Sequence, residues 1–520
     1  MIFILAISKH EIRLDLKKEK RYLIATADEL TWKFDRPVVF LGEWCRIYSR
    51  KAIWKNMDAI VAPPYGLGLA KKDADFAFAS ELRKKIFPQF CDLLNHFHGT
   101  QHSERFWKIV LGHWFRRTID VLINRINTLK QCICKYKVSG VTVITSESYS
   151  LATSDSYSAI WACNDDMWNS ALTGRILTLL KLAQFPVEYL SVGTNNKNSF
   201  ELQHSVSDLS YKRRTLKALN NAILKVVKFF SRKNDGMIIS SYLPPLKEIE
   251  LYLALGKFPR KLVLPDLKVT EKPDRLFRDR LSGYFKSQSG NDSEFIITSL
   301  LFELLPVCYL EGFKVLKQIA NKQPWPEFPK FIFTSNCFDT NEIFKLWAAQ
   351  KIEMDLKYFT GQHGNNYGTH RYIYPSVEEE TADKFLTWGW TDGLTQHTPA
   401  FIFKLAGRKT KKKKYRYGSL LLISVSLDHR KCTWDNSYEF GEYFGELQEF
   451  VSSLSDGSRK NLTLRLHAVY RYMMWDEAAR WNEFDPTIRI DHGSSRLRKL
   501  IEESRLVVHS YDSTGMLETM

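Results

Sequence analysis

A glycine-rich segment with a central histidine is the part of the sequence best suited to proton chemistry. Gly361-Gln362-His363-Gly364 directly follow an apolar run over 357–360 that is typical of a buried strand. Glycines let the backbone turn sharply and approach a ligand, and an imidazole can accept the proton of a hydroxyl near neutral pH. The alternative is a glycine-rich turn whose histidine bonds only to backbone. We predict that His363 is a general base and that its three neighbours shape the loop.

The C-terminal end of the sequence has the composition of an anion-binding turn. An apolar run over 505–509 leads into hydroxyl-bearing residues and a glycine, where a helix is expected to begin. Hydroxyls and free backbone N–H groups at a helix start attract a phosphate or pyrophosphate. The alternative is an ordinary capped helix, with Ser513 or Thr514 as N-cap and Glu518 as its capping partner. The residues predicted to hold the anion are Ser510, Ser513, Thr514, Gly515 and Glu518.

A cation and a second imidazole end another apolar run. Arg465 and His467 stand at the end of the run over 461–466. A guanidinium and an imidazole at a strand terminus can contact a diphosphate. The alternative is an arginine at the edge of a half-buried strand.

Charge and composition limit the classes of partner. The 520 residues are 44% hydrophobic and 26% charged, which is typical of a globular protein. Lys plus Arg exceed Asp plus Glu by 75 − 58 = 17, and this favours phosphate-bearing ligands or an anionic membrane surface. No RNA-recognition, helix-turn-helix or zinc-finger pattern is present, so we predict no nucleic-acid partner.

Cysteine usage and hydropathy indicate the compartment. The eight cysteines form no C-x-x-C pair, so we predict no structural zinc site and no other metal. Scattered cysteines without a secretion signal indicate a reducing environment. No apolar stretch reaches the ~20 residues that cross a bilayer. We therefore predict a cytoplasmic protein whose membrane contact is at most peripheral.

The elements that must position the candidate residues are short apolar strands that alternate with helices. Helical periodicity covers residues 104–130 and 158–182. Alternation of this kind indicates βαβ units and parallel sheets, whose ligands lie beyond the carboxyl ends of the strands. The runs predicted as strands are 22–26, 37–41, 59–62, 141–145, 237–240, 330–334, 357–360, 384–387, 419–425, 461–466, 487–490 and 505–509.

A basic run divides the chain. Residues 408–416 contain seven Lys or Arg, and such runs usually mark linkers. We predict an N-terminal arm over 1–20, an α/β domain with helical insertions over 21–407, the linker 408–416, and a Rossmann-like domain over 417–520. About 100 residues are too few to cover both faces of a doubly wound sheet, so we expect the last domain to be incomplete.

Taken in order, the candidate motifs resemble the marker motifs of GT-B glycosyltransferases. The similarity is to bacterial capsule-polysaccharide transferases and to CDP-glycerol glycerophosphotransferases of teichoic-acid synthesis. The motifs are Gln362-His363-Gly364, then Asp383 before the run KFLTWGW, then Arg465-x-His467, then Tyr511-Asp512-Ser513-Thr514-Gly515-x-x-Glu518. Where the related enzymes usually have His-Pro, this chain has His467-Ala468.

A closer similarity extends over most of the chain. The stretches LIATADELTWKFDRPVVFLGEWCRIY, VAPPYGLG, HGTQHSERFWKIVLGHW and SRLVVHSYDSTGMLET look like a bacterial family of transferases found in surface-carbohydrate gene clusters, such as those for capsule or lipopolysaccharide. The resemblance implies a GT-B-like α/β fold, with two Rossmann-like domains that face a cleft. It implies that His363 activates the acceptor, that Arg465 and His467 contact the donor phosphates, and that the C-terminal turn binds the donor.

The predicted function is therefore transfer of a sugar from a nucleotide-activated donor to a surface-polysaccharide or lipid-linked glycan acceptor. The donor is a substrate, and no resident cofactor is predicted. Three alternatives remain: a polyol-phosphate transferase, a non-catalytic nucleotide- or glycan-binding protein of the same fold, and a hydrolase that uses His363 with Asp383. A basic enzyme of this kind would work at the inner face of the cytoplasmic membrane.

Overall fold

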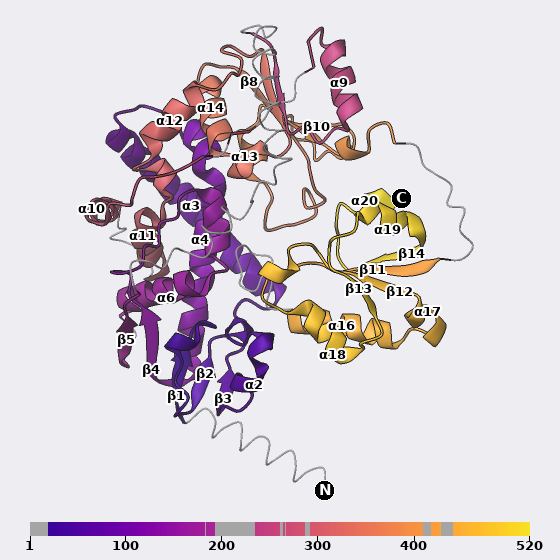
Figure 1. Ribbon diagram of the computed structural model, residues 1–520. Coiled ribbons are helices and arrows are strands. Elements are labelled where there is room, and N and C mark those ends of the chain that lie inside the picture. Colours follow the sequence, from indigo (N-terminus) through magenta and orange to yellow (C-terminus); the bar gives the residue numbers. More distant parts are fainter. Residues whose placement is uncertain are drawn as a thin grey trace.

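Within the described residues, three parallel β-sheets are flanked by helices (Figure 1). The computed structural model describes residues 19–181, 184–192, 234–259, 264–265, 267–285, 292–408, 418–427 and 440–519. The predicted α/β class with Rossmann-like parallel sheets is confirmed. Of the predicted arm 1–20 and linker 408–416, nearly all residues lie outside the described part. No helix in the described part is long and apolar enough to cross a membrane.

The first sheet has the strand order β3-β2-β1-β4-β5. Its central strands are buried on both faces, which explains why the sequence shows them as continuous apolar runs. The order reverses between β1 and β4, as in half of a Rossmann fold. The strands are β1 (Lys20–Ile24), β2 (Val38–Phe40), β3 (Ala59–Val61), β4 (Lys137–Ile144) and β5 (Val187–Leu190).

The second sheet has the strand order β10-β9-β8-β7-β6 and is also parallel. Its helices include α14 (Glu342–Ile352) and α15 (Val377–Thr381). The segment 21–407, which the sequence predicted as one domain, thus contains two separate sheets. The strands are β6 (Met237–Ile239), β7 (Phe331–Thr334), β8 (Lys357–Gly361), β9 (Lys384–Thr387) and β10 (His397–Pro399).

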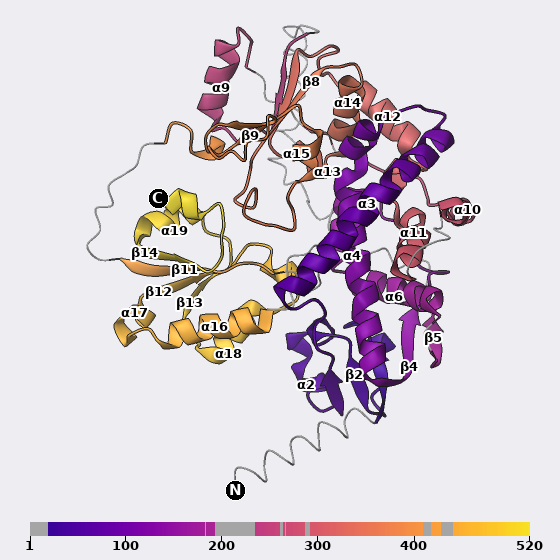
Figure 2. The same ribbon diagram turned by 180° about the vertical axis from the view of Figure 1, so that it is seen from behind.

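Two long helices connect these sheets. α3 (Leu69–His98) and α4 (Glu104–Lys135) run side by side between them, as Figure 2 shows from behind. The Ser103 hydroxyl caps α4 by accepting a hydrogen bond from Phe106 N at 3.1 Å. Apolar side chains of α4 join one hydrophobic core that includes residues of both sheets. α4 is therefore placed to supply polar side chains to the second sheet.

The third sheet forms the C-terminal domain and has the order β13-β12-β11-β14. It has its own hydrophobic core, centred on Trp481. The order reverses between β11 and β14, and such a switch point is where open α/β sheets bind ligands. Its strands and main helices are β11 (Ser419–Ile423), β12 (Leu462–Arg465), β13 (Arg489–Asp491), β14 (Ser504–His509), α16 (Phe440–Ser452), α18 (Glu477–Phe484) and α19 (Leu497–Glu503).

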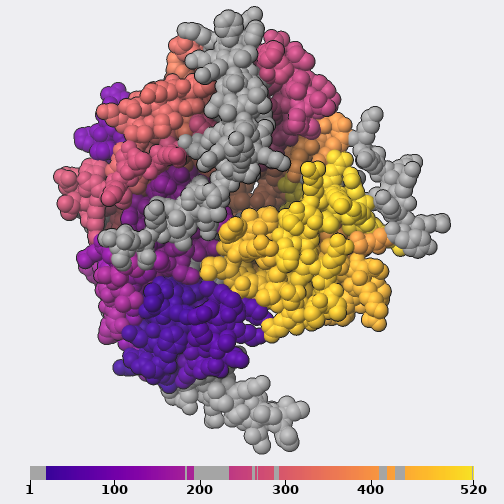
Figure 3. Space-filling model, viewed as in Figure 1, coloured from indigo at the N-terminus to yellow at the C-terminus, as the bar shows by residue number. Residues whose placement is uncertain are grey.

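The C-terminal domain packs against the N-terminal sheet. Figure 3 shows its yellow surface in contact with the indigo residues of the N-terminal part. The Asp476 carboxylate accepts a hydrogen bond from Ser49 N at 2.9 Å, and the Arg480 guanidinium lies 4.2 Å from the centre of the Tyr48 ring. These contacts fix how the third sheet faces the other two.

All twelve predicted strands are present, with ends that differ by a few residues. Residues 158–182 form two helices, α5 (Ser156–Ala162) and α6 (Asp166–Leu180). β5 and β10 were not predicted from the sequence. The remaining helices and 3-10 turns are η1 (Glu29–Thr31), η2 (Glu43–Cys45), η3 (Tyr48–Arg50), α2 (Lys51–Trp54), α9 (Pro245–Ala254), α10 (Arg275–Phe285), α11 (Asp292–Leu304), η4 (Val307–Tyr309), α12 (Phe313–Asn321), α13 (Cys337–Thr340), η5 (Phe403–Leu405), α17 (Asp456–Lys460), η7 (Tyr470–Tyr472) and α20 (Met516–Thr519).

Candidate active site

The predicted base loop begins where β8 ends, at the carboxyl edge of the second sheet. Gly361 is the last residue of β8, and a Cβ atom there would lie 2.5 Å from Phe403 Cε2 and 2.7 Å from Ser335 Oγ. No larger residue fits without moving these neighbours, since real Cβ contacts are not that short. The glycine therefore lets β8 pack closely beneath the loop that carries His363.

Gln362 holds the loop in shape from inside. Its side chain is buried, and its Oε1 atom accepts hydrogen bonds from Trp388 N and Trp390 Nε1, both at 2.8 Å. Its Nε2 atom donates to the Gly364 carbonyl at 2.8 Å. A buried amide with these bonds is satisfied at both ends, so Gln362 positions the loop and is not available to a ligand.

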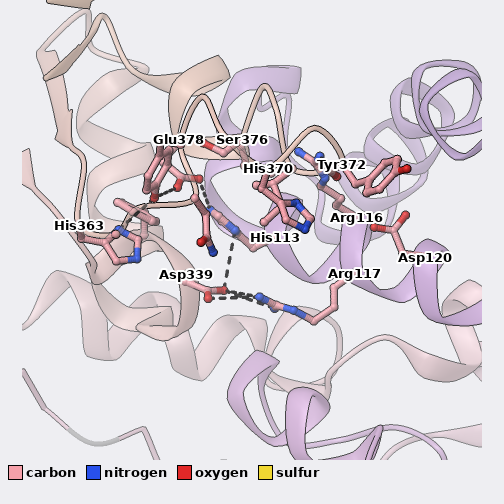
Figure 4. A pocket seen from close by; sticks show the side chains of 16 residues that line it. His113, Arg116, Arg117, Asp120, Asp339, His363, His370, Tyr372, Ser376 and Glu378 are labelled. Atoms are coloured by element: carbon pink, nitrogen blue, oxygen red, sulfur yellow. Dashed lines mark hydrogen bonds and ion pairs between the residues drawn. The ribbon is translucent and has the colours of Figure 1, made fainter. Parts of the chain in front are cut away.

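His363 is the first member of a hydrogen-bonded chain. Its Nδ1 atom lies 3.0 Å from the Tyr367 hydroxyl, and that hydroxyl donates a very short hydrogen bond to Glu378 Oε1 (Figure 4). Because the single Tyr367 proton goes to the carboxylate, the imidazole must donate from Nδ1. Its Nε2 atom is then left with a free lone pair. This is the tautomer that a general base requires.

Side chains from α4 and α13 lie next to this chain. Glu378 Oε2 lies 3.3 Å from His113 Nε2, and His113 Nδ1 lies 3.9 Å from Asp339 Oδ1. Arg117 in turn pairs with Asp339 at 3.2 Å. Figure 4 shows these side chains converging from the helices toward the loop of His363. They line a cavity of about 210 Å³ together with His363 and Tyr367.

Burial and charge set the protonation of the site. Burial lowers the pKa of His363, although the nearby carboxylates partly oppose this. For Glu378, burial alone would raise the pKa, but the contacts with His113 and the Tyr367 hydroxyl lower it to about 2. The pKa of Asp339 is likewise held below its usual value by Arg117 and His113, against the effect of burial. Near neutral pH the site thus holds a neutral His363 beside two carboxylates.

The base loop contacts the predicted anion-binding turn of the other domain. Asn365 Nδ2 donates to Asp512 Oδ1 at 2.8 Å across the domain boundary. A Cβ atom built on Gly364 would lie 3.9 Å from Thr514 Oγ1. The structure therefore brings together two loops that are about 150 residues apart in the sequence, one after β8 and one after β14.

Within the C-terminal turn, hydroxyls hold the backbone in place. Ser510 Oγ donates to the Ile423 carbonyl at 2.9 Å and lies 2.7 Å from the Tyr443 hydroxyl. Ser513 Oγ accepts from Gly515 N at 3.1 Å, a hydrogen bond within the turn that precedes α20. The turn lies at the switch point of the third sheet. The side chain of Glu518 lies outside the described part.

Arg465 and His467 lie at the end of β12, on the same edge of the third sheet. Arg465 is engaged within the domain, since it pairs closely with Asp491 and donates to the Gly493 carbonyl at 3.2 Å. His467 Nδ1 accepts a hydrogen bond from Val469 N at 3.3 Å. Burial, together with the charge of Arg465, lowers the pKa of His467. A neutral His467 that accepts at Nδ1 carries its proton on Nε2, where it can donate to an anion.

Comparison with known proteins identifies the family. A family model described as LIC12162 family transferase matches residues 21–520. The chain belongs to this family. No curated protein and no solved structure matches it. Membership makes the chain a transferase, and the family description names neither donor nor acceptor.

The structure does not place Asp383 beside His363. Asp383 precedes β9 and accepts a hydrogen bond from Tyr358 N at 2.8 Å, and it lies 3.3 Å from Arg105. It therefore stands at the amino edge of a parallel sheet whose carboxyl edge carries His363. Asp383 therefore joins the first residues of β8 and β9, and it does not form a dyad with His363.

Most of the side chains that surround His363 were not predicted from the sequence. Tyr367 follows His363 by four residues, which is the only local signal among them. The others come from distant segments, and their types alone do not distinguish them from surface charges. They are His113, Arg117, Asp339 and Glu378.

Two other sequence clusters have structural roles. His98 contacts the backbone, since its Nε2 atom lies 3.0 Å from the Tyr309 carbonyl. Asp165, in the Asn164-Asp165-Asp166 segment, caps α6 by accepting from Trp168 N at 2.9 Å. Asp165 is therefore engaged as a helix cap.

Proposed function

We propose that this transferase moves a sugar from a nucleotide-activated donor to a hydroxyl of a glycan acceptor, with His363 as general base. The observation that carries the proposal is the hydrogen-bonded chain from His363 through Tyr367 to Glu378. It favours an imidazole with a free Nε2 lone pair, next to the loop of the other domain that is best suited to a phosphate.

In the proposed reaction, His363 Nε2 takes the proton from the acceptor hydroxyl as its oxygen forms a bond to the anomeric carbon. The bond from that carbon to the nucleotide phosphate breaks, and the nucleotide leaves with the bonding electron pair. The imidazolium that forms keeps its Nδ1–H bond to Tyr367, and the Glu378 carboxylate stabilises its charge.

We assign the donor to the carboxyl edge of the third sheet. The backbone N–H groups and hydroxyls of Ser513 and Thr514, with the Nε2–H of His467, would neutralise the leaving phosphate. We propose that Arg465 acts there through its charge, because its hydrogen bonds are already made to Asp491 and Gly493. This arrangement suits a nucleoside diphosphate or monophosphate as leaving group.

The cavity beside His363 suits a hydroxyl-rich acceptor. Its lining includes donors such as Arg117, acceptors such as Asp339, and the aromatic residues Phe338 and Tyr367. We propose that the acceptor belongs to a surface polysaccharide or a lipid-linked glycan. Nucleotide-activated donors and such lipids are both present at the inner face of the cytoplasmic membrane. We propose that the enzyme acts there.

The test is a comparison of wild type with His363→Ala and His363→Asn across a panel of nucleotide sugars and CDP-glycerol. Thermal shift measures donor binding, because a ligand that binds only the folded state raises its apparent stability. Nucleotide release with and without acceptor measures transfer. We expect both variants to bind donor as wild type does and to lose transfer by ~10²–10⁴-fold.

Other outcomes of this experiment would reject the proposal. Transfer that is unchanged in both variants would show that His363 does not act in the reaction. Turnover with CDP-glycerol alone would establish the polyol-phosphate alternative. Donor binding by wild type without turnover on any acceptor would favour a non-catalytic protein, and release without acceptor would favour a hydrolase.

A further inference from the structure

Glu378, which accepts the proton of the Tyr367 hydroxyl, lies on a very short helix. α15 has five residues, Val377–Thr381, and an isolated helix of this length is not stable in water. Glu378 is its second residue and is buried. The position of the carboxylate must therefore be fixed by the elements against which α15 packs.

Arg116 of α4 holds the segment that leads into α15. Its Nη1 atom donates to the Pro375 carbonyl at 2.6 Å, and its Nη2 atom donates to the Tyr372 carbonyl at 3.0 Å. Figure 4 shows Arg116 beside Tyr372. Both acceptors are backbone oxygens, so Arg116 fixes the course of the chain just before the helix begins.

Arg105, about three turns earlier on α4, holds the other end of α15. Its Nε and Nη2 atoms donate to the Thr381 carbonyl at 3.0 and 2.7 Å, and Arg105 also lies 3.3 Å from Asp383. Thr381 is the last residue of α15, where helix carbonyls have no partner within the helix. The two arginines therefore attach both ends of α15 to α4.

Gly112 lies between these arginines on the same side of α4. Residues 105, 112 and 116 are seven and four positions apart, so they form one stripe along the helix. A Cβ atom on Gly112 would lie 2.9 Å from Val377 Cγ1, which shows how closely α15 packs on this stripe. The next residue, His113, places its Nε2 atom 3.3 Å from Glu378 Oε2. α4 thus both holds α15 and contacts its carboxylate.

We infer that Arg105 and Arg116 are positioning residues, which hold Glu378 against Tyr367 and thereby set the tautomer of His363. A shift of α15 by about 1 Å would weaken the bond from Tyr367 to Glu378, and misplacements of this size can cost ~10²-fold in rate. The Tyr367 proton could then turn to the imidazole. The effect on catalysis rests on the proposed role of His363, whereas the tautomer can be observed without any transfer.

The experiment is ¹⁵N NMR of the His363 ring in the full chain at pH 8, where the imidazole is neutral. A nitrogen that carries a proton and one that does not have different ¹⁵N shifts, so the spectrum reports the tautomer. His363→Asn assigns the signal. The test variant is Arg105→Gln with Arg116→Gln, and Tyr367→Phe gives the reference spectrum of a histidine without its fixed partner.

The matched control is Arg125→Gln on the same helix. Arg125 donates to the Cys163 carbonyl at 3.1 Å and to Asn169 Oδ1 at 2.9 Å, so the control also loses hydrogen bonds of an α4 arginine but none to α15. Circular dichroism melting checks that all variants are folded. If the double variant does not fold, the two single variants are judged by the same criteria.

We expect wild type and the control to carry the His363 proton on Nδ1, and the double variant to show a mixture of both tautomers, as Tyr367→Phe does. In transfer assays, kcat of the double variant should fall by ~10–10²-fold while donor binding is unchanged. A mixed tautomer in an enzyme whose transfer does not depend on His363 would support the positioning role and reject the proposed function.

Three results would overturn the inference. The first is a double variant that keeps the wild-type tautomer. The second is a control that loses this tautomer as well, because the effect would then be a general loosening of α4. The third is a wild-type protein that carries the His363 proton on Nε2.

Discussion

At the scale of single residues, the protonation of His363 depends on its neighbours more than on its type. Tyr367 uses its proton on Glu378, so the histidine must donate from Nδ1 and keep Nε2 free. Burial lowers the pKa of the imidazole, which keeps it neutral at physiological pH. A histidine in an open glycine-rich turn would have neither property.

The pH dependence of transfer should report this state of His363. The base acts only when neutral, so kcat/KM should fall as pH drops through a pKa below the usual ~6.5 of histidine and be level from pH 7 to 8. The profile is measured with saturating acceptor at constant ionic strength. An acid limb centred above 6.5 would contradict the lowered pKa.

Tyr367→Phe should separate positioning from base chemistry. The change removes the hydroxyl between His363 and Glu378, so the imidazole loses its fixed tautomer but remains in the loop. We expect kcat to fall by ~10-fold, less than the 10²–10⁴ that a general base contributes, and the acid limb of the pH profile to move. The measurement is the full pH profile of the variant. A variant that matches wild type in both would show that the hydroxyl does not orient the histidine.

At the scale of elements, close packing at the end of β8 decides where the loop lies. Gly361→Ala should destabilise the protein by about 1–3 kcal/mol, because the added methyl meets Phe403 and Ser335 at less than 3 Å. Transfer should fall as well, since the loop must shift. The matched control is Gly283→Ala on α10, where no atom lies within 4 Å of the added Cβ.

Denaturant unfolding measures both glycine variants. The control should be neutral or slightly stabilised, because alanine favours a helix by up to ~1 kcal/mol over glycine. Equal stability of Gly361→Ala and wild type would mean that β8 and η5 can move apart without cost.

Helix α18 carries a buried acid whose protonation affects the stability of the C-terminal domain. Glu477 is 2% exposed, and burial raises its pKa to about 8 against the charge of Arg480. Since the folded-state pKa lies above the unfolded value, the folded state binds the proton more tightly. This stabilisation is complete below about pH 4 and is lost as pH rises to about 8.

Glu477→Gln should remove that pH dependence. We expect the variant to be more stable than wild type at pH 8–9, on the order of a few kcal/mol, with the difference shrinking toward pH 5. Thermal unfolding across this pH range measures the difference in stability between the variant and wild type. Glu446→Gln on α16 serves as control, because Glu446 is exposed and should show no such trend. A difference that is constant with pH would assign the effect to packing.

At the scale of the whole molecule, the two loops of the proposed site meet because two domains pack together. The hydrogen bond from Asn365 to Asp512 joins the loop of the base to the turn of the third sheet. The contacts of Tyr48 and Ser49 with the C-terminal domain hold the same two parts together at another place. Either loop alone has half of the proposed chemistry.

A double-mutant cycle on Asn365→Ala and Asp512→Ala should measure this connection. Both single variants lose one exposed hydrogen bond, so unfolding should change by less than about 1 kcal/mol. In transfer kinetics we expect a coupling of about 1 kcal/mol between the two positions. Strict additivity in kcat/KM would indicate that the two loops act independently.

The sequence by itself determined twelve of the strands, the parallel α/β class and the two loops that carry hydroxyls and histidine. Buried parallel strands are continuous apolar runs, so each can be recognised from a short stretch of sequence. β5 and β10 were not predicted, because β5 is half-exposed and β10 is three residues long and ends in proline. Asp383 was misplaced relative to His363 because a residue before a strand and one after a strand lie at opposite edges of the sheet.

Only the tertiary structure decided which groups surround the base. Glu378, His113 and Asp339 line the cavity beside His363 from α15, α4 and α13, and their spacing in the sequence does not indicate that they lie together. The reason is physical: their pKa values and the tautomer of His363 depend on burial and on distances of 3–4 Å, which arise only when α4 packs across the second sheet. The meeting of the base loop with the turn after β14 likewise depends on how the domains pack.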